Sequence, residues 1–233
     1  YTTGNLGTQG SWVQGGSGTD IQVSNNTPIT YAGYNGGDEE YIYIGSTNGI
    51  DSYKSFTNQP TPAGFTTFSI WISFIVNVTS KPTTTDNGAY SISLREGGTG
   101  TSYPGRLFFS KDAAGKLEFG ISKSATTPFS ITDNDYAMGT TYLIVIRYEF
   151  VNGTLNDNMY LWVNPSLLTE PSVSSPTLSQ TGATTDPPYG ANGIERIMIH
   201  QRNTDGAVAK IEGIRIAKSW VDLDCHVKTF YSK

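Results

Sequence analysis

Few residues of this chain could do chemistry, and they are scattered. Neither His200 nor His226 has a histidine, cysteine or carboxylate partner at metal-binding spacing, which argues against a zinc site. A Ser-His-Asp arrangement stays open because its members can lie far apart in sequence, although no Gly-x-Ser-x-Gly elbow is present. We expect His200 on a strand face. The lone Cys225 cannot form an internal disulfide and is interpreted as a bystander near a chain end.

Carboxylates are the second kind of reactive group, since glycoside hydrolysis needs two of them across the scissile bond. The densest acidic cluster, Asp38-Glu39-Glu40, follows Asn35-Gly36-Gly37 and is interpreted as a solvated turn. Calcium is the one cofactor that the sequence leaves open, because residues 133–135 and 156–158 are rich in oxygen ligands. Asp and Asn in turns usually bond to their own backbone, which argues against calcium, and no other cofactor is predicted.

Flat aromatic rings beside polar groups are suited to binding sugars. Trp71, Tyr160 and Trp162 project away from the apolar stripes of their strands, and with Arg147 and Glu149 they could form an exposed carbohydrate-binding platform. In the alternative that we favour for Trp71 and Trp162, loops cover this face and the rings fill a secondary core, because large aromatic side chains are mostly buried. Other candidate contact residues, in Gly- and Pro-rich loops, are Tyr31, Tyr34, Tyr103 and Tyr189.

These side chains must be positioned by β-strands, since no segment of a dozen residues keeps a helical apolar stripe. The clearest strand is 66–78, where apolar residues alternate with mostly polar ones. Residues 141–151 are almost continuously apolar, which predicts a central strand covered on both sides, with Arg147 and Glu149 emerging near one end. Further strands are predicted at 21–23, 41–44, 53–57, 89–95, 106–110, 116–122, 158–163, 193–201 and 207–217.

Many strands at short spacing, with no helices between them, predict an all-β antiparallel sandwich or barrel. Residues 165–188 are rich in Pro, Ser and Thr and predict a surface excursion with one edge strand near 173–178. Nothing in the composition divides the chain. We therefore predict a single domain over 1–233, with a long surface loop at about 165–190 and a short C-terminal tail at 223–233.

The segment 211–220 predicts the closing strand of the sandwich. Alternation places Ile214 and Ile216 on one face and Arg215 and Ala217 on the other. Gly213 separates two β-branched halves, which indicates a bulge or a close approach of another backbone. Arg215 is interpreted as a surface or rim ion-pair partner.

Several stretches, spread in order over nearly the whole chain, resemble the sequence pattern of a known family of domains. They include Ser73-Phe74-Ile75-Val76-Asn77-Val78, Gly105-Arg106-Leu107-Phe108, Gly139-Thr140-Thr141-Tyr142-Leu143 and the closing segment that ends in Trp220-Val221-Asp222. In these stretches the chain resembles concanavalin A-like, or laminin-G-like, jelly-roll domains of exported surface proteins in Bacteroidetes-type bacteria. The resemblance implies a two-sheet jelly roll. Glycan hydrolases of this general fold carry Glu-x-Asp-x-x-Glu on one strand, and its absence here predicts a protein that is not an enzyme.

Composition restricts the partners. The net charge of −5 argues against a nucleic-acid binder, which usually carries a basic patch. No apolar run is long enough to span a membrane. Only 15% of the residues are charged, and polarity comes from Thr, Ser, Asn and 26 glycines, as is typical of secreted or cell-surface proteins. Because no signal peptide opens the sequence, export implies processing upstream of Tyr1.

The favoured hypothesis is a non-catalytic extracellular module for carbohydrate binding or adhesion, with a glycan or cell-surface polysaccharide as its partner. The alternative is a structural subunit of an extracellular filament, sheath or other surface assembly, whose partners are copies of itself joined through an exchanged terminal strand. A glycoside hydrolase with carboxylates on separate strands is the least favoured hypothesis.

Overall fold

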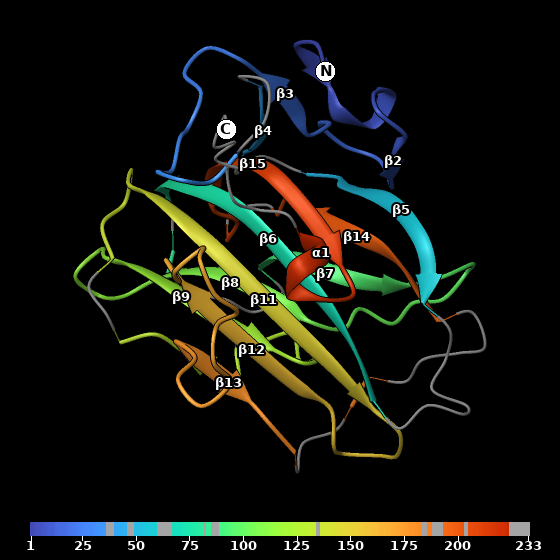
Figure 1. The fold of residues 1–233 in the computed structure, drawn as a ribbon. Helices are drawn as coiled ribbons and strands as arrows, with labels where there is room; N and C mark the ends of the chain where they lie inside the picture. The colour runs from blue at the N-terminus through green and yellow to red at the C-terminus, as the bar shows by residue number, and fades with distance from the viewer. Residues whose placement is uncertain are drawn as a thin grey trace, which may run out of the picture.

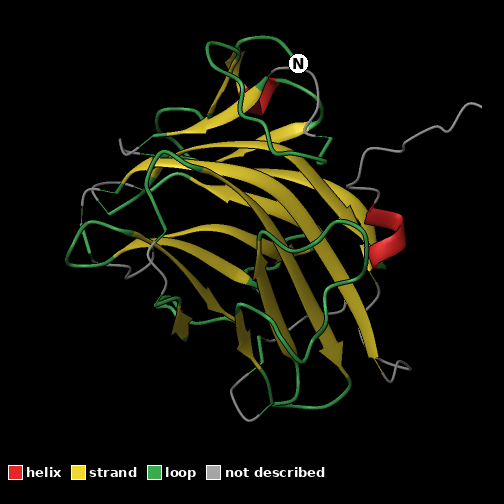
Figure 2. Cartoon of the chain, turned by 60° about the vertical axis from the view of Figure 1, so that its left-hand side comes forward, coloured by secondary structure: helices red, strands yellow, loops and turns green. Residues whose placement is uncertain are grey.

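The structure is a computed structural model that describes residues 1–35, 40–45, 49–59, 67–81, 83–84, 89–133, 136–182, 186–187, 193–202 and 205–223, with the backbone alone for Asn58 and Gln59. Two antiparallel β-sheets stack as layers, with loops around their edges (Figures 1 and 2). Within these ranges no helix is long and apolar enough to cross a membrane.

The first layer is an eight-stranded sheet. In spatial order its strands are β1 (Gly4–Asn5), β3 (Gln22–Ser24), β4 (Tyr41–Ile44), β15 (Val208–Ala217), β6 (Thr67–Ser80), β11 (Thr141–Val151), β12 (Asn158–Val163) and β13 (Leu178–Gln180). β6 and β11 pair along eleven residues in its interior. The position of β11 between β6 and β12 confirms the predicted central strand.

The second layer is a seven-stranded sheet. Its strands, in spatial order, are β10 (Ser130–Ile131), β9 (Leu117–Ser122), β8 (Arg106–Lys111), β7 (Tyr90–Glu96), β14 (Ile194–His200), β5 (Asp51–Gln59) and β2 (Trp12–Gly15). Two short helical elements complete the described fold, the 3-10 turn η1 (Leu6–Thr8) and α1 (Trp220–Leu223).

The main core lies between the two sheets and follows from strand alternation. From the eight-stranded sheet, β6 contributes Ile70, Ile72 and Phe74, and β11 contributes Ile144 and Tyr148. The seven-stranded sheet faces them with Ile92, Leu107, Phe119 and Ile197, among others. Because the core uses every second residue, the outer faces of both sheets remain available for other packing or for a site.

The closing strand has the predicted irregularity. Ile214 and Ile216 pack against the main core, while Ala217 packs on the outer face. The register of β15 against β6 shifts between Glu212 and Arg215, and Gly213 there has a φ of +66°, a conformation that favours glycine. The bulge predicted from Gly213 is thus confirmed. Arg215 donates to the carbonyl of Asn35 and stacks over Tyr34.

Candidate functional site

Two residues of the predicted platform, Trp71 and Trp162, are buried. Trp71 on β6 is 2% exposed and Trp162 on β12 is 4% exposed. Their rings stack at a centroid distance of 5.8 Å, and the ring of Trp220 packs edge-on against Trp71. The idea of an exposed tryptophan platform is therefore corrected: the rings fill a second core, which is the alternative that the burial tendency of large aromatic residues favoured.

This second core lies on the outer face of the eight-stranded sheet. Its buried members are Ile29, Tyr34, Trp71, Ile75, Leu143, Val145, Trp162, Trp220 and Leu223. Three segments cover the sheet: residues 29–34, α1, and the loop after β12, where Leu167 packs inward and the carbonyl of Ser172 accepts a hydrogen bond from Trp162 at 3.2 Å. Removal of these rings from water is what holds the Pro- and Ser-rich loop on the sheet.

The other predicted platform residues form the rim of the second core. The Arg147 guanidinium lies over Trp71, with Cζ 5.4 Å from the ring centroid, and pairs with Glu149 at 2.6 Å. Asn158 donates to the second oxygen of Glu149, and Tyr160 is half-buried beside Arg147. The polar groups of this rim are largely satisfied by one another, so it offers few unbonded groups to a sugar.

A stronger candidate lies on the outer face of the seven-stranded sheet. Arg95 on β7 lies directly opposite Arg196 on β14, and Tyr53 on β5 lies opposite Met198. A register shift after Tyr90 turns that ring outward, where it meets the outward-facing Phe108. We call this surface the arginine–tyrosine face; its members are Tyr53, Tyr90, Arg95, Tyr103, Arg106, Arg196 and Arg202.

Every arginine of this face stacks on a tyrosine ring. The distances from Cζ to the ring centroid are 4.9 Å for Arg196 and 5.9 Å for Arg95 over Tyr53, 5.3 Å for Arg95 over Tyr103, and 4.5 Å for Arg106 and 4.6 Å for Arg202 over Tyr90. Such contacts contribute about 0.5–2 kcal/mol each. They hold flat rings and planar cations in one partly exposed layer.

Positive charge exceeds negative charge on this face. Within the described ranges, Arg202 pairs with Asp51 at 3.4 Å and Arg196 pairs with Glu195 at 2.8 Å. Three guanidinium nitrogens are buried without a hydrogen-bond partner among the described residues, namely Nη1 of Arg106, Nε of Arg196 and Nε of Arg202. In a chain of net charge −5, the local excess of positive charge on this face is suited to an anion.

A serine, a histidine and an aspartate meet beneath the arginine–tyrosine face. The Oγ of Ser93 is 2.8 Å from Nε2 of His200, and Nδ1 of His200 is 3.0 Å from Oδ2 of Asp51. These are the contacts of a Ser-His-Asp relay. However, Ser93 is 0% exposed, and the rings of Tyr90 and Tyr103 pack edge-on against the imidazole. A substrate would reach the hydroxyl only after these rings moved.

The protonation of His200 follows from its burial. Desolvation lowers its pKa to about 4, although the hydrogen bond and charge of Asp51 act in the other direction. Nδ1 also lies 2.8 Å from Nη2 of Arg202, so it accepts from Arg202 in one tautomer and donates to Asp51 in the other. The neutral imidazole thus links β5, β7 and β14 under the arginine–tyrosine face, as the expected strand-face position allows.

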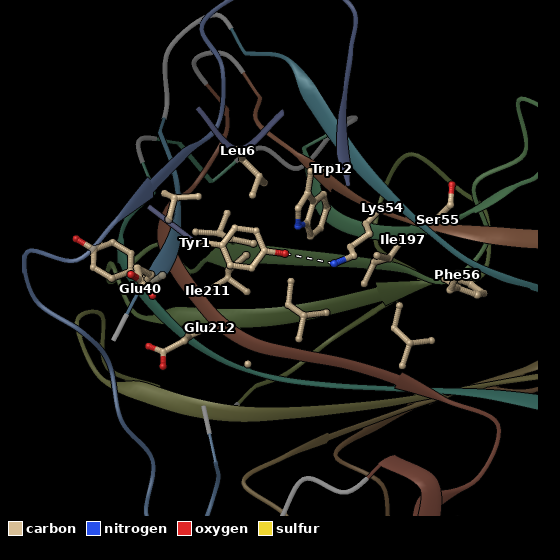
Figure 3. A pocket seen from close by; sticks show the side chains of 16 residues that line it. Tyr1, Leu6, Trp12, Glu40, Lys54, Ser55, Phe56, Ile197, Ile211 and Glu212 are labelled. Carbon is tan, nitrogen blue, oxygen red and sulfur yellow. Dashed lines mark hydrogen bonds between the residues drawn. The ribbon is translucent and has the colours of Figure 1, made fainter. Parts of the chain in front are cut away.

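A cavity of about 340 Å³ opens where the two sheets part near the N-terminus (Figure 3). Its walls are mostly apolar, with Leu6, Trp12 and Ile211 among them. Tyr1 and Lys54 point toward each other across it, and Nζ of Lys54 donates to the Tyr1 hydroxyl at 3.3 Å. Glu40, Lys54 and Glu212 add charged groups to its lining.

The residues that the structure describes contain no cluster of three acidic, histidine or cysteine side chains that could hold a metal ion such as calcium. In the segment 156–158, the Asp157 carboxylate instead accepts hydrogen bonds from Tyr148 and from the backbone of Val151. Several residues considered in the sequence lie outside the described ranges: Asp38, Glu39, Asn134, Asp135, Tyr189, Cys225 and His226.

Neither a family model nor the sequence of a curated protein matches this chain. Among solved structures, Lotus tetragonolobus seed lectin is similar at a TM-score of 0.48 and 11% identity, over 91% of this chain and 95% of the lectin. Arcelin-5, a lectin-like defense protein from Phaseolus vulgaris, is similar at a TM-score of 0.44 and 10% identity, over 90% of this chain and 92% of arcelin-5. A Trypanosoma rangeli sialidase is similar at a TM-score of 0.47 and 9% identity. That match covers 92% of this chain and 32% of the sialidase.

The sheet order confirms the predicted all-β class, because the described chain folds as two stacked antiparallel sheets of eight and seven strands.

Proposed function

We propose that this protein binds carbohydrate without cleaving it, and that its ligand is an acidic glycan that lies on the arginine–tyrosine face. Flat tyrosine rings such as Tyr53 suit the apolar faces of sugar rings. The guanidinium groups of Arg95 and Arg196 suit carboxylate or sulfate groups, which carry the opposite charge and accept charge-assisted hydrogen bonds. Uronate, sialate and sulfate groups share this chemistry.

The observation that carries the proposal is the layer of four arginines stacked on tyrosine rings, in which Asp51 and Glu195 are the carboxylates seen in ion pairs among the described residues. An anionic ligand would compensate the positive charge of this layer, whereas a neutral glycan would leave it uncompensated.

The cellular setting belongs to the same proposal. The charge-poor composition and the resemblance to exported jelly-roll domains support a secreted or cell-surface protein that adheres to a polysaccharide. Binding without catalysis is supported by the burial of Ser93, whose hydroxyl lies beneath Tyr90 and Tyr103. Because no metal cluster is found among the described residues, we expect binding that does not need calcium.

Self-assembly is the second candidate function, favoured by one feature of β5. β2 pairs only with the Asp51–Lys54 part of this strand, and the apolar cavity adjoins the following residues Ser55 and Phe56. A strand from another copy could extend the seven-stranded sheet there. High-mass particles that grow with protein concentration in light scattering, with no glycan binding, would favour this candidate over the first.

An array of acidic and neutral glycans, probed with and without a chelator, tests the main proposal. We expect binding to acidic glycans only, unaffected by the chelator and lost in the Arg95→Ala/Arg196→Ala variant. Arg215→Ala is a matched control, because that arginine also stacks on a tyrosine, Tyr34, but belongs to the eight-stranded sheet. Equal binding by both variants, or hydrolysis of a glycan, would contradict the proposal.

A further inference from the structure

The two sheets are joined at one edge by a buried charged cluster that the glycan proposal does not use. Lys123 directly follows β9 and is 0% exposed. Its Nζ lies 2.6 Å from Oδ1 of Asp186, 3.0 Å from the carbonyl oxygen of Asp157 and 3.3 Å from that of Gly182. These partners come from the ends of β12 and β13 in the other sheet.

The carboxylate of Asp186 is held as tightly as the amine. The backbone N–H of Asn156 donates to Oδ2 at 2.9 Å, and that of Asp157 donates to Oδ1 and Oδ2 at 3.2 and 3.3 Å. The Asp186 side chain is 9% exposed. An amine and a carboxyl group thus meet in a dry, fixed geometry, with two backbone donors on the oxygen atoms where negative charge would develop during acyl transfer.

We propose that Lys123 and Asp186 form an intramolecular amide crosslink that covalently joins the two sheets. A buried ion pair pays a large desolvation cost, and the amide removes both charges. Proximity supplies what free amines and carboxylates in water lack, namely a reacting pair already in contact.

The step balances without an oxidant, a reductant or an added reagent. One proton passes from the ammonium to Oδ1, which gives a neutral amine and a neutral acid. The Nζ lone pair then attacks Cγ of Asp186 and forms the C–N bond. A second proton follows to Oδ1, the Cγ–Oδ1 bond breaks, and one water leaves toward the partly exposed side of Asp186. Oδ2 remains as the amide oxygen, on the N–H of Asn156.

Asp157 is the acidic neighbour that positions this pair. Its backbone carbonyl accepts from Lys123 and its backbone N–H donates to Asp186, while its buried carboxylate accepts hydrogen bonds from the Tyr148 hydroxyl at 3.0 Å and from the Val151 N–H at 2.8 Å. Burial is the largest influence on the pKa of this carboxyl group and raises it to about 6, so the charge beside the pair changes near neutral pH. We assign Asp157 as a positioning residue.

The test is the intact mass of the purified, folded protein under denaturing conditions. We expect a mass about 18 Da below that of the sequence, the mass of one water. Trypsin should release one branched product in which residues 117–147, uncleaved after Lys123, are joined to residues 148–196. A folded wild-type protein that keeps its full mass after incubation between about pH 5 and 8 has a buried ion pair only, and the proposal is then overturned.

Variants locate the bond. Lys123→Arg should abolish the mass loss, and Lys116→Arg, a lysine on the same hairpin, should retain it. Asp186→Asn should still crosslink but release ammonia, about 17 Da, a signature that a merely structural role cannot produce. Asp157→Asn should slow crosslinking after refolding and remove its pH dependence. A mass loss unchanged in Lys123→Arg would assign it to another site and contradict the proposal.

Discussion

Trp162→Ala separates a stabilising role of the second core from a role in sugar binding. The side chain is 4% exposed, stacks on Trp71 and Tyr160 and donates one hydrogen bond to the carbonyl of Ser172. Truncation of a buried tryptophan costs about 3–5 kcal/mol. For a chain of this size, that loss lowers the melting temperature by roughly 6–20 °C. Urea titration followed by tryptophan fluorescence measures the free energy of unfolding, and a glycan array measures binding.

The variant should be less stable yet still bind acidic glycans, because the arginine–tyrosine face belongs to the other sheet. Leu168→Ala is the matched control: Leu168 lies in the same loop but is 92% exposed, so its truncation should leave stability almost unchanged. The assignment of Trp162 to a second core is refuted if Trp162→Ala keeps wild-type stability and loses glycan binding.

Three further perturbations follow from the structure. The pKa of His200 is about 4 in the folded protein, whereas that of an unfolded histidine is about 6.5, so the neutral side chain stabilises the fold by about 3 kcal/mol at neutral pH. This stability should be lost as the pH falls from 6.5 to 4. Urea titrations at several pH values should show the loss in the wild-type protein and not in His200→Gln. The raised pKa of Asp157 makes the free energy of unfolding change in the opposite direction with pH, because it favours the folded state at low pH. The difference between the wild-type protein and His200→Gln therefore isolates the contribution of His200. Gly49→Ala would place a Cβ 2.2 Å from the carbonyl oxygen of Gln201 and should destabilise by about 1–3 kcal/mol in the same titration. Chelator should change neither the melting temperature nor glycan binding by more than experimental error, and a clear fall in either would restore the calcium option.

The strands in the interior of the sheets were predictable because alternation alone defines them. Residues 141–151 and 158–163 have the predicted bounds, and the strand predicted at 66–78 is observed as Thr67–Ser80. The short edge strands β1, β2 and β10 were not predicted, since two to four residues carry too little periodicity. The edge strand predicted near 173–178 is displaced, because residues 173–177 form turn and loop and the strand pairing with β12 is Leu178–Gln180.

The candidate site was harder to predict than the fold. The strands that carry Arg95, Arg196 and His200 were predicted, His200 was expected on a strand face, and Tyr103 was among the other candidate contact residues. What no local pattern shows is that β7, β14 and β5, far apart in sequence, are neighbours in the sheet. For the same reason the contact of Asp51 with His200 was not predicted. Tryptophan was the more conspicuous signal, but its size is what drives it into the second core.

The most direct test of the proposed function is a calorimetric titration with an oligosaccharide of uronic acid and with its neutral counterpart. We predict binding of the acidic ligand that weakens as salt is raised, because exposed charges are screened. The Arg95→Gln/Arg196→Gln variant should bind at least about tenfold more weakly, since each lost charge-assisted hydrogen bond contributes about 1.5–3 kcal/mol. Equal affinity for the neutral oligosaccharide, or full affinity in the variant, would contradict the assignment of the arginine–tyrosine face.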